Sequence, residues 1–202
     1  MGCNTAMLFG ALLLAAYLAG SVSAAIVVCR ALGVGDPRAG GSGNPGATNV
    51  LRLAGKGPAA VTLLGDAGKG VLPVLLAAAL GLHGWQLTAI GLAAFAGHLF
   101  PVFYGLRGGK GVATFLGVNL ALDPWLALCF VLTWLAVAGV TRYSSLAALV
   151  ATAVLPLVAA WRGADAGSVV LFVAMAALIY WRHRGNIGQL LAGTEKRIGQ
   201  KA

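Results

Sequence analysis

Charged residues are scarce in this 202-residue sequence, and acidic residues are the scarcest of them. Asp, Glu, Lys and Arg together make up 9% of the chain, and only five residues are acidic. Because 59% of the residues are hydrophobic and the mean hydropathy is +0.89, the chain lacks the polar surface of a soluble domain. This composition excludes an ordinary soluble basic protein and predicts an integral membrane protein.

Cysteine and histidine are also rare, with three residues of each. The cysteines lie at positions 3, 29 and 129 and form no Cys-x-x-Cys pair, so neither a zinc site nor a disulfide framework is indicated. We interpret them as small apolar fillers. The histidines lie apart, and Glu195 is the only carboxylate near His183, so we expect no metal and no cofactor.

Basic residues outnumber acidic ones by 14 to 5, which gives a net charge of +9 and a pI near 10.1. Such values are typical of proteins that bind nucleic acid. Here the basic residues lie in short loops between apolar runs. We therefore expect membrane lipid, and no nucleic acid, as a partner.

Seven apolar runs predict an all-α polytopic membrane protein, because most are near the roughly 20 residues that cross a bilayer as a helix. The first run lacks the basic residues that precede the core of a secretory signal, so we expect it to remain as a membrane helix. The fourth is too short to cross upright, and we expect a tilted helix that ends near Asp123, with Pro124 opening the next. The runs cover residues 6–28, 57–80, 85–104, 112–122, 125–140, 145–161 and 167–182.

The basic residues also orient the bundle, because Lys and Arg favour the cytoplasmic ends of membrane helices. In one orientation only Arg162 lies outside, while Lys69 lies within a span. We predict seven crossings, an external N-terminus and a cytoplasmic C-terminus. No room remains for a soluble domain, so we expect residues 1–202 to form a single integral membrane domain. The cytoplasmic side would hold Arg30, Arg38, Arg52, Lys56, Arg107, Lys110, Arg142, Arg182, Arg184, Lys196, Arg197 and Lys201.

One polar stretch, residues 39–49 followed by Arg52, stands apart from this apolar background. Its glycines permit positive φ and leave backbone N–H groups bare, so that these can converge on an anion. It matches the Gly-x-Gly-x-x-Gly dinucleotide fingerprint from Gly41 to Gly46, but no strand precedes it and Pro45 lies inside it. We interpret it as a phosphate-binding loop outside any dinucleotide fold.

Further polar stretches fall on the same predicted side. Residues 105–111 end in Gly-Lys-Gly, which fails the P-loop pattern in detail but keeps its bare amides and lysine. Residues 182–186 place two arginines, a histidine and an asparagine within little more than one helical turn. No histidine is followed by Asp five residues later, and no Gly-x-Ser-x-Gly motif occurs. The predicted site is rich in groups that hold anions and poor in general bases.

Asp66 and Lys69 lie three residues apart in the second predicted span, so they share a helix face and can neutralise each other. Charged residues at membrane depth are candidates for function. An ion pair that only closes a helix interface is an equally good interpretation. We assign the pair to positioning the Gly-rich loops.

Together these stretches resemble the bacterial acyl-phosphate:glycerol-3-phosphate acyltransferases, the PlsY family, over nearly the whole chain. The matching segments are residues 42–52, 97–103 with 108–114, 141–146 and 182–195. Leu106 stands where an aromatic residue is common, and Gln189 where a basic residue is usual. The resemblance implies a seven-helix enzyme of the bacterial cytoplasmic (inner) membrane with its active site on the cytoplasmic face.

The implied reaction moves a fatty acyl group from acyl phosphate to the 1-hydroxyl of glycerol 3-phosphate. The products would be lysophosphatidate and inorganic phosphate, at the start of phospholipid biosynthesis. The resemblance also implies that neither acyl-CoA nor acyl carrier protein is the direct donor. An enzyme that forms acyl phosphate would be the functional neighbour.

We assign candidate residues to three roles on this basis. The expected catalytic residues are Lys110, Ser42, Arg52, His183 and Asn186. The expected phosphate and substrate contacts are Gly43, Asn44, Thr48, Asn49, Gly108, Gly109, Gly111, Thr114, Ser144, Ser145 and His98. The expected positioning residues are Asp66, Lys69, Arg142 and Glu195.

Two questions stay open at the level of sequence. The donor phosphate could accept the proton of the glycerol hydroxyl, or an acyl-enzyme could form on Ser42 or Ser144. A membrane transporter for a phosphorylated solute is the alternative function, because basic loops and charge within a span also suit that role. Against it, every polar stretch lies on one face and no repeat is evident.

Overall fold

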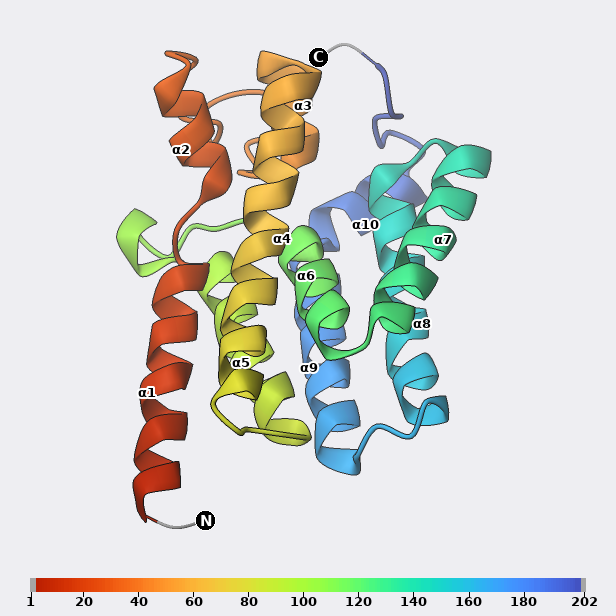
Figure 1. Ribbon diagram of the computed structural model, residues 1–202. Coiled ribbons are helices and arrows are strands. Elements are labelled where there is room, and N and C mark those ends of the chain that lie inside the picture. The colour runs from red at the N-terminus through yellow and green to blue at the C-terminus, as the bar shows by residue number, and fades with distance from the viewer. Residues whose placement is uncertain (1–2, 201–202) are drawn as a thin grey trace.

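The protein is a bundle of roughly parallel α-helices (Figure 1). The structure is a computed structural model that describes residues 3–200, and no strand occurs in that range; residues 1, 2, 201 and 202 of the predicted single domain, with Lys201, lie outside it. The helices are α1 (Cys3–Gly20), α2 (Ala24–Ala31), α3 (Ala47–Ala54), α4 (Lys56–Ala79), α5 (Trp85–Leu99), α6 (Val112–Leu122), α7 (Pro124–Thr141), α8 (Ser144–Trp161), α9 (Ala166–Arg182) and α10 (Arg184–Leu191), with a 3-10 turn, η1 (Val102–Tyr104).

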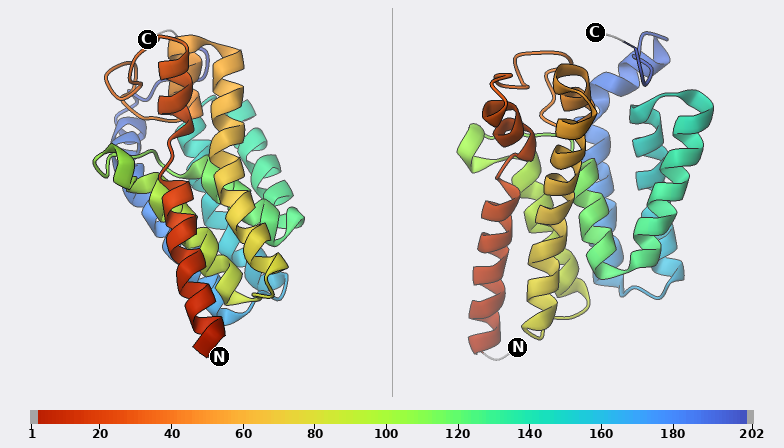
Figure 2. Two further views of the ribbon diagram at one scale, coloured as in Figure 1. Left: turned by 60° about the vertical axis from the view of Figure 1, so that its left-hand side comes forward. Right: turned by 45° about the horizontal axis from the view of Figure 1, so that its top comes forward.

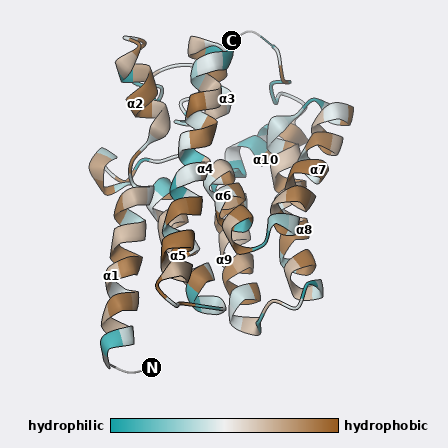
Figure 3. Cartoon of the chain, in the orientation of Figure 1, coloured by the Kyte–Doolittle hydropathy of each residue, from teal (hydrophilic) through white to brown (hydrophobic). Residues whose placement is uncertain are grey.

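The apolar runs of the sequence form the long helices, whose residues are hydrophobic along most of their length (Figure 3). In the described part of the chain, five segments are long and apolar enough to cross a bilayer: Asn4–Ala31, Lys56–Ala79, Trp85–Tyr104, Pro124–Thr141 and Ser144–Trp161. The pair α9 and α10, bent by 59°, makes a sixth if it is taken as one broken span. The short fourth run is confirmed as α6, which has 11 residues and occupies only part of the height of the bundle (Figure 1).

The first predicted span is a broken helix, where the sequence predicted a continuous one. Ser23 ends the continuity because its side chain caps α2, accepting a hydrogen bond from the amide of Ile26 at 3.4 Å. The hydroxyl of Ser21 donates to the carbonyl of Tyr17 at 2.9 Å and closes the end of α1. The break leaves the Val22 carbonyl outside a helix, and the ammonium group of Lys69 donates to it at 2.8 Å.

Three other boundaries differ from the predicted ones. α5 stops at Leu99, five residues early, because Phe100 precedes a proline and cannot stay helical. The Gly-rich stretch runs into a helix, α3, from Ala47, and the polar tail forms α10. Both are eight-residue helices that mix polar and apolar residues and contain no long apolar run, so the hydrophobic pattern did not mark them.

Glycines set the distance between the central helices. A Cβ on Gly70 of α4 would lie 2.4 Å from the carbonyl oxygen of Thr114, and a Cβ on Gly117 of α6 would lie 2.0 Å from that of Ala67. The two helices therefore cross with their backbones in contact. Phe115 of α6 packs edge-on against three other rings, those of Phe95, Phe130 and Phe172. These contacts fix α6 in the middle of the bundle.

The polar connections collect toward one end of the bundle. The Gly-rich loop before α3, the start of α6, the α7–α8 turn and the segment after α10 lie toward the upper end in Figure 1, and the turned views of Figure 2 agree. The turns at residues 81–84 and 162–165 lie at the lower end. The predicted grouping of the motif loops on one face is thus confirmed in space.

Candidate active site

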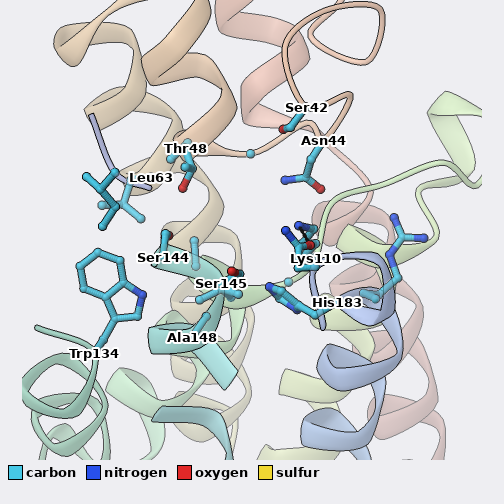
Figure 4. Close-up of a pocket in the computed structure, with 18 of the residues that line it drawn as sticks. Ser42, Asn44, Thr48, Leu63, Lys110, Trp134, Ser144, Ser145, Ala148 and His183 are labelled. Atoms are coloured by element: carbon cyan, nitrogen blue, oxygen red, sulfur yellow. Dashed lines mark hydrogen bonds between the residues drawn. The ribbon is translucent and has the colours of Figure 1, made fainter. Parts of the chain in front are cut away.

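A cavity of about 760 Å³ opens where these polar connections meet. The Gly-rich loop and α3, α6, α7, α8, the α9–α10 junction and the segment after α10 all contribute to its lining. Figure 4 shows the side chains of Leu63 and Trp134 on one side of it and those of Lys110 and His183 on the other. The predicted site residues that line it are Ser42, Asn44, Thr48, Arg52, Asp66, His98, Lys110, Gly111, Ser144, Ser145, His183, Asn186 and Glu195.

A chain of hydrogen bonds fixes the polar side of the cavity. The ammonium group of Lys110 donates to the side-chain oxygen of Asn186. The Asn186 amide donates to both oxygens of Glu195, at 2.8 and 3.0 Å, and the hydroxyl of Ser145 donates to Glu195 at 2.6 Å. Residues from a loop, α8, α10 and the tail are thereby locked together, and Lys110 is aimed by a neutral partner.

Burial lowers the pKa of Lys110 from its ordinary value of 10.5 to about 8. The negative charge of Glu195 opposes this shift, while the positive charges of Arg182 and Arg52 add to it. Lys110 is therefore a cation near neutral pH whose proton is more easily lost than that of a surface lysine. Such a group can stabilise negative charge that develops beside it.

His183 reaches the cavity beside Lys110 from the end of α9 (Figure 4). Its Nδ1 lies 2.8 Å from the carbonyl oxygen of Ile179, which can only accept a hydrogen bond. Nδ1 therefore carries the hydrogen, and Nε2 of the neutral ring is an acceptor. A hydroxyl group in the cavity is a suitable donor to it.

The glycine amides of residues 108 and 109 do not face a ligand as predicted. The Gly108 amide donates to the carbonyl of Leu99 and the Gly109 amide to that of His98, each at 3.2 Å. Arg182 clamps the loop from the other side, because its guanidinium donates to both glycine carbonyls, at 3.0 Å for Gly109. Among the four amides of residues 108–111, those of Lys110 and Gly111 have no acceptor within residues 3–200, so this loop offers these two to an anion.

Asn49 also differs from its predicted role, because its side chain is used inside the Gly-rich loop. It is 1% exposed, accepts from the Ser42 amide at 2.8 Å, and donates to the carbonyls of Pro37 and Gly40 at 2.8 and 3.1 Å. Gly41 lies so close that a Cβ there would be 2.2 Å from the Asn49 oxygen. Asn49 therefore shapes the loop, while Ser42 and Asn44 line the cavity (Figure 4).

Three more predicted residues lie away from the cavity lining. Thr114 is fully buried in the α4–α6 crossing. Gly43 forms a turn at φ +68° in the Gly-rich loop. Arg142, the residue directly after α7, holds the C-terminal segment. Its carbonyl accepts a hydrogen bond from the Ile198 amide at 2.7 Å, and its guanidinium donates to the Ile198 carbonyl at 3.0 Å.

The apolar side of the cavity was not predicted. It is formed where α6 is too short to fill the space between α4 and α7, and the partly exposed Leu63 and Leu135 border it on the side of those helices. Apolar residues carry no motif, so no sequence signal identified them. Arg182 also lines the cavity without a predicted role of its own, although its position directly before His183 is a signal in the sequence. The apolar lining comprises Leu63, Val112, Ala113, Leu116, Phe130, Val131, Trp134, Leu135 and Ala148.

Three buried charged or titratable side chains lie beneath the polar side. The ammonium group of Lys69 lies 2.9 Å from Oδ1 of Asp66, which confirms the predicted pairing on one helix face. Nδ1 of His98 lies 3.5 Å from the same oxygen. His98 is 6% exposed and packs against Gly109, where a Cβ would lie 2.2 Å from Nε2. His98 thus packs against the loop backbone and also reaches the cavity lining, and its predicted contact with substrate stays a prediction.

Comparisons with known proteins agree with this geometry. A family model described as glycerol-3-phosphate acyltransferase matches residues 10–193. A glycerol-3-phosphate acyltransferase of Thioalkalivibrio sulfidiphilus is 56% identical over 195 residues, covering 96% of each chain. Another, of Halorhodospira halophila, is 59% identical over 188 residues, covering 93% of this chain and 95% of the relative.

Solved structures give the same result. The crystal structure of PlsY (YgiH), an integral membrane glycerol 3-phosphate acyltransferase, in its glycerol 3-phosphate form superposes with a TM-score of 0.90 at 43% identity, covering 95% of this chain and 96% of that one. Its lysophosphatidic acid form superposes with a TM-score of 0.88 at 41% identity, covering 95% of both. These relatives give no support to the transporter alternative. The chain therefore belongs to the glycerol-3-phosphate acyltransferase family of integral membrane enzymes.

Proposed function

We propose that the protein transfers a fatty acyl group from acyl phosphate to the 1-hydroxyl of sn-glycerol 3-phosphate, releasing lysophosphatidate and inorganic phosphate. One observation carries this proposal: a single cavity has phosphate-type donors on one side and an apolar wall on the other. An acyl phosphate has the matching shape, with an oily tail and an anionic head. The solved relatives named for their glycerol 3-phosphate and lysophosphatidic acid forms support the acceptor and the product.

In this proposal the two phosphates are held from opposite walls. Ser42, Asn44, Thr48 and Arg52 contribute side-chain donors from the Gly-rich loop and α3. The Lys110 side chain and the amides of residues 110–111 face them. Each charge-assisted contact contributes about 1.5–3 kcal/mol to binding. The acyl tail lies between α4 and α7, above the short α6.

The acyl acceptor, glycerol 3-phosphate, is oriented by the hydrogen-bonded polar side chains at the ends of α8 and α10. Ser144, Ser145 and Asn186 line the cavity there, and Nε2 of His183 accepts a hydrogen bond from the 2-hydroxyl of glycerol 3-phosphate, which leaves the proton of the 1-hydroxyl free. The 1-hydroxyl oxygen attacks the acyl carbon, its proton passes to the donor phosphate, and the bond between the acyl carbon and the phosphate oxygen breaks. Lys110 stabilises the charge on the acyl oxygen or on the leaving phosphate. Placing both substrates in one cavity supplies much of the rate enhancement.

We propose seven crossings, counting α6, with the N-terminus outside and the cavity at the cytoplasmic face of the bacterial inner membrane. The strong bias of Lys and Arg toward the end that holds the motif loops supports this orientation. The whole chain acts as a single domain, and an enzyme that makes acyl phosphate supplies its donor.

The donor proposal predicts that, of acyl phosphate, acyl-CoA and acyl carrier protein thioesters, only acyl phosphate yields lysophosphatidate with the purified protein and glycerol 3-phosphate. The products of each mixture are followed with a radiolabelled acyl chain. Without acceptor, no labelled acyl group remains on the protein, because the donor phosphate takes the proton directly. A stable adduct that disappears in Ser42→Ala or Ser144→Ala would instead establish the acyl-enzyme route.

A second prediction concerns pH. Transfer falls as the pH rises through about 8, because Lys110 then loses the proton that makes it a cation. In Glu195→Gln the attraction that raises the Lys110 pKa is gone, so the basic limb moves to lower pH. The measurement is kcat between about pH 6 and pH 10, which brackets this titration. Asp123→Asn, at the opposite end of the bundle, is the control and leaves the limb in place; an unmoved limb in Glu195→Gln contradicts the assignment.

A further inference from the structure

Three buried side chains in the membrane spans take no direct part in the proposed reaction. Asp66, Lys69 and His98 are 1%, 9% and 6% exposed and lie on α4 and α5, and Asp66 and His98 also reach the cavity lining. Charged groups at this depth are costly, and proteins keep them where they serve a function. Their contacts show which function that is.

Lys69 joins two parts of the bundle. Its ammonium group lies 2.9 Å from the Asp66 carboxylate and donates at 2.8 Å to the carbonyl of Val22, in the break between α1 and α2. Without the ammonium group of Lys69, the break would leave the Val22 carbonyl oxygen without this hydrogen-bond donor. Asp66 is thereby held in place by a group that is itself anchored to the first span.

His98 connects Asp66 to the loop of residues 108–111. Its Nδ1 lies 3.5 Å from Asp66, and its ring lies against Gly109, leaving no space for a Cβ. Its carbonyl accepts from the Gly109 amide at 3.2 Å. From the opposite side Arg182 donates to the carbonyls of the same two glycines. Gly109 is therefore held by an imidazole and a guanidinium, directly before the Lys110 and Gly111 amides, which have no acceptor within residues 3–200.

We propose that Asp66, Lys69 and His98 are positioning residues that set the glycine loop of residues 108–111 for phosphate binding. Lys69 orients Asp66, Asp66 orients the imidazole of His98, and the imidazole fixes Gly109. The amides of Lys110 and Gly111 then converge on the cavity. This inference rests on the proposed function, and it adds that the loop is organised from within the membrane spans.

The test is the affinity of the full-length protein in detergent for glycerol 3-phosphate and, separately, for inorganic phosphate, measured by titration calorimetry without a donor. For at least one ligand, Asp66→Asn and His98→Gln each raise Kd about tenfold. Because Asp66 acts through His98, the double variant is within about twofold of the weaker single one. The matched control is Thr88→Val, which removes a buried hydrogen bond of 3.0 Å to Ser168 between α5 and α9; it lowers the unfolding temperature and leaves Kd unchanged.

Multiplicative effects, near a hundredfold in the double variant, or unchanged Kd values would overturn the inference. If the parent protein binds neither ligand, the proposed function is contradicted together with this inference. If the parent binds but the variants do not behave as stated, only the inference fails. If Asp66→Asn does not fold, Gly109→Ala decides instead, since its Cβ would collide with the His98 ring. Adding His98→Ala then recovers at least about fivefold in affinity over Gly109→Ala, and no recovery overturns the inference.

Discussion

Lys110→Ala is expected to abolish acyl transfer while the helical bundle stays folded. The side chain is the cation at the centre of the polar wall, held toward the cavity by Asn186. Removing one well-placed donor to a developing oxyanion typically costs 10²–10³ in kcat, and here a full positive charge goes with it, so we expect a loss of about 10³-fold. The measurement is kcat with saturating acyl phosphate and glycerol 3-phosphate.

The bundle should tolerate this change, because Lys110 lies in a loop and makes its side-chain bond only at the cavity wall. Lys56→Ala is the control: this lysine is exposed at the start of α4, toward the same end of the bundle, and its loss leaves turnover unchanged. Unfolding temperatures of both variants stay near that of the parent. Turnover of Lys110→Ala within a few-fold of the parent would remove Lys110 from the mechanism.

Gly117→Leu is expected to displace α6 and to destroy both stability and activity. A Cβ at this position would lie 2.0 Å from the carbonyl oxygen of Ala67, and backbone of a packed helix cannot move aside cheaply. Overpacking a close-packed core typically costs about 1–3 kcal/mol, and a clash with backbone lies at the upper end of that range. Because α6 begins directly after Gly111, the phosphate loop moves with it. Thermal unfolding in detergent and acyl transfer are the two measurements.

Gly68→Leu is the matched control on the facing helix. A Cβ on Gly68 meets no atom within 4 Å, so the same substitution finds open space one residue after Ala67, on another face of α4. Leucine is also a better helix former than glycine, by up to about 1 kcal/mol. This variant is therefore expected to unfold at or above the parental temperature and to keep its activity. Equal damage in both variants would show that the α4–α6 crossing is not what matters.

The positions of the long helices could be predicted from the sequence, because they depend on local composition. The apolar runs became α4 and α6–α9 nearly to the residue, and the short run at 112–122 has the predicted bounds. Asp66 and Lys69 pair as their spacing indicated, since residues three apart meet on any helix. The break before Ser23 was missed, because a polar residue in an apolar run marks a helix end only when its side chain caps the next turn.

For the candidate site residues, too, one part could be predicted from the sequence and another part could not. Sequence by itself determined which polar stretches meet at one end of the bundle and that they carry groups suited to phosphate, since alternating spans place them there. Only the tertiary structure decided which of these groups are free to bind. The side chain of Asn49 and the amides of Gly108 and Gly109 are used by partners seven to twelve residues away along the chain. A hydrogen-bonding group can serve either the fold or a ligand, and contacts between distant segments settle which.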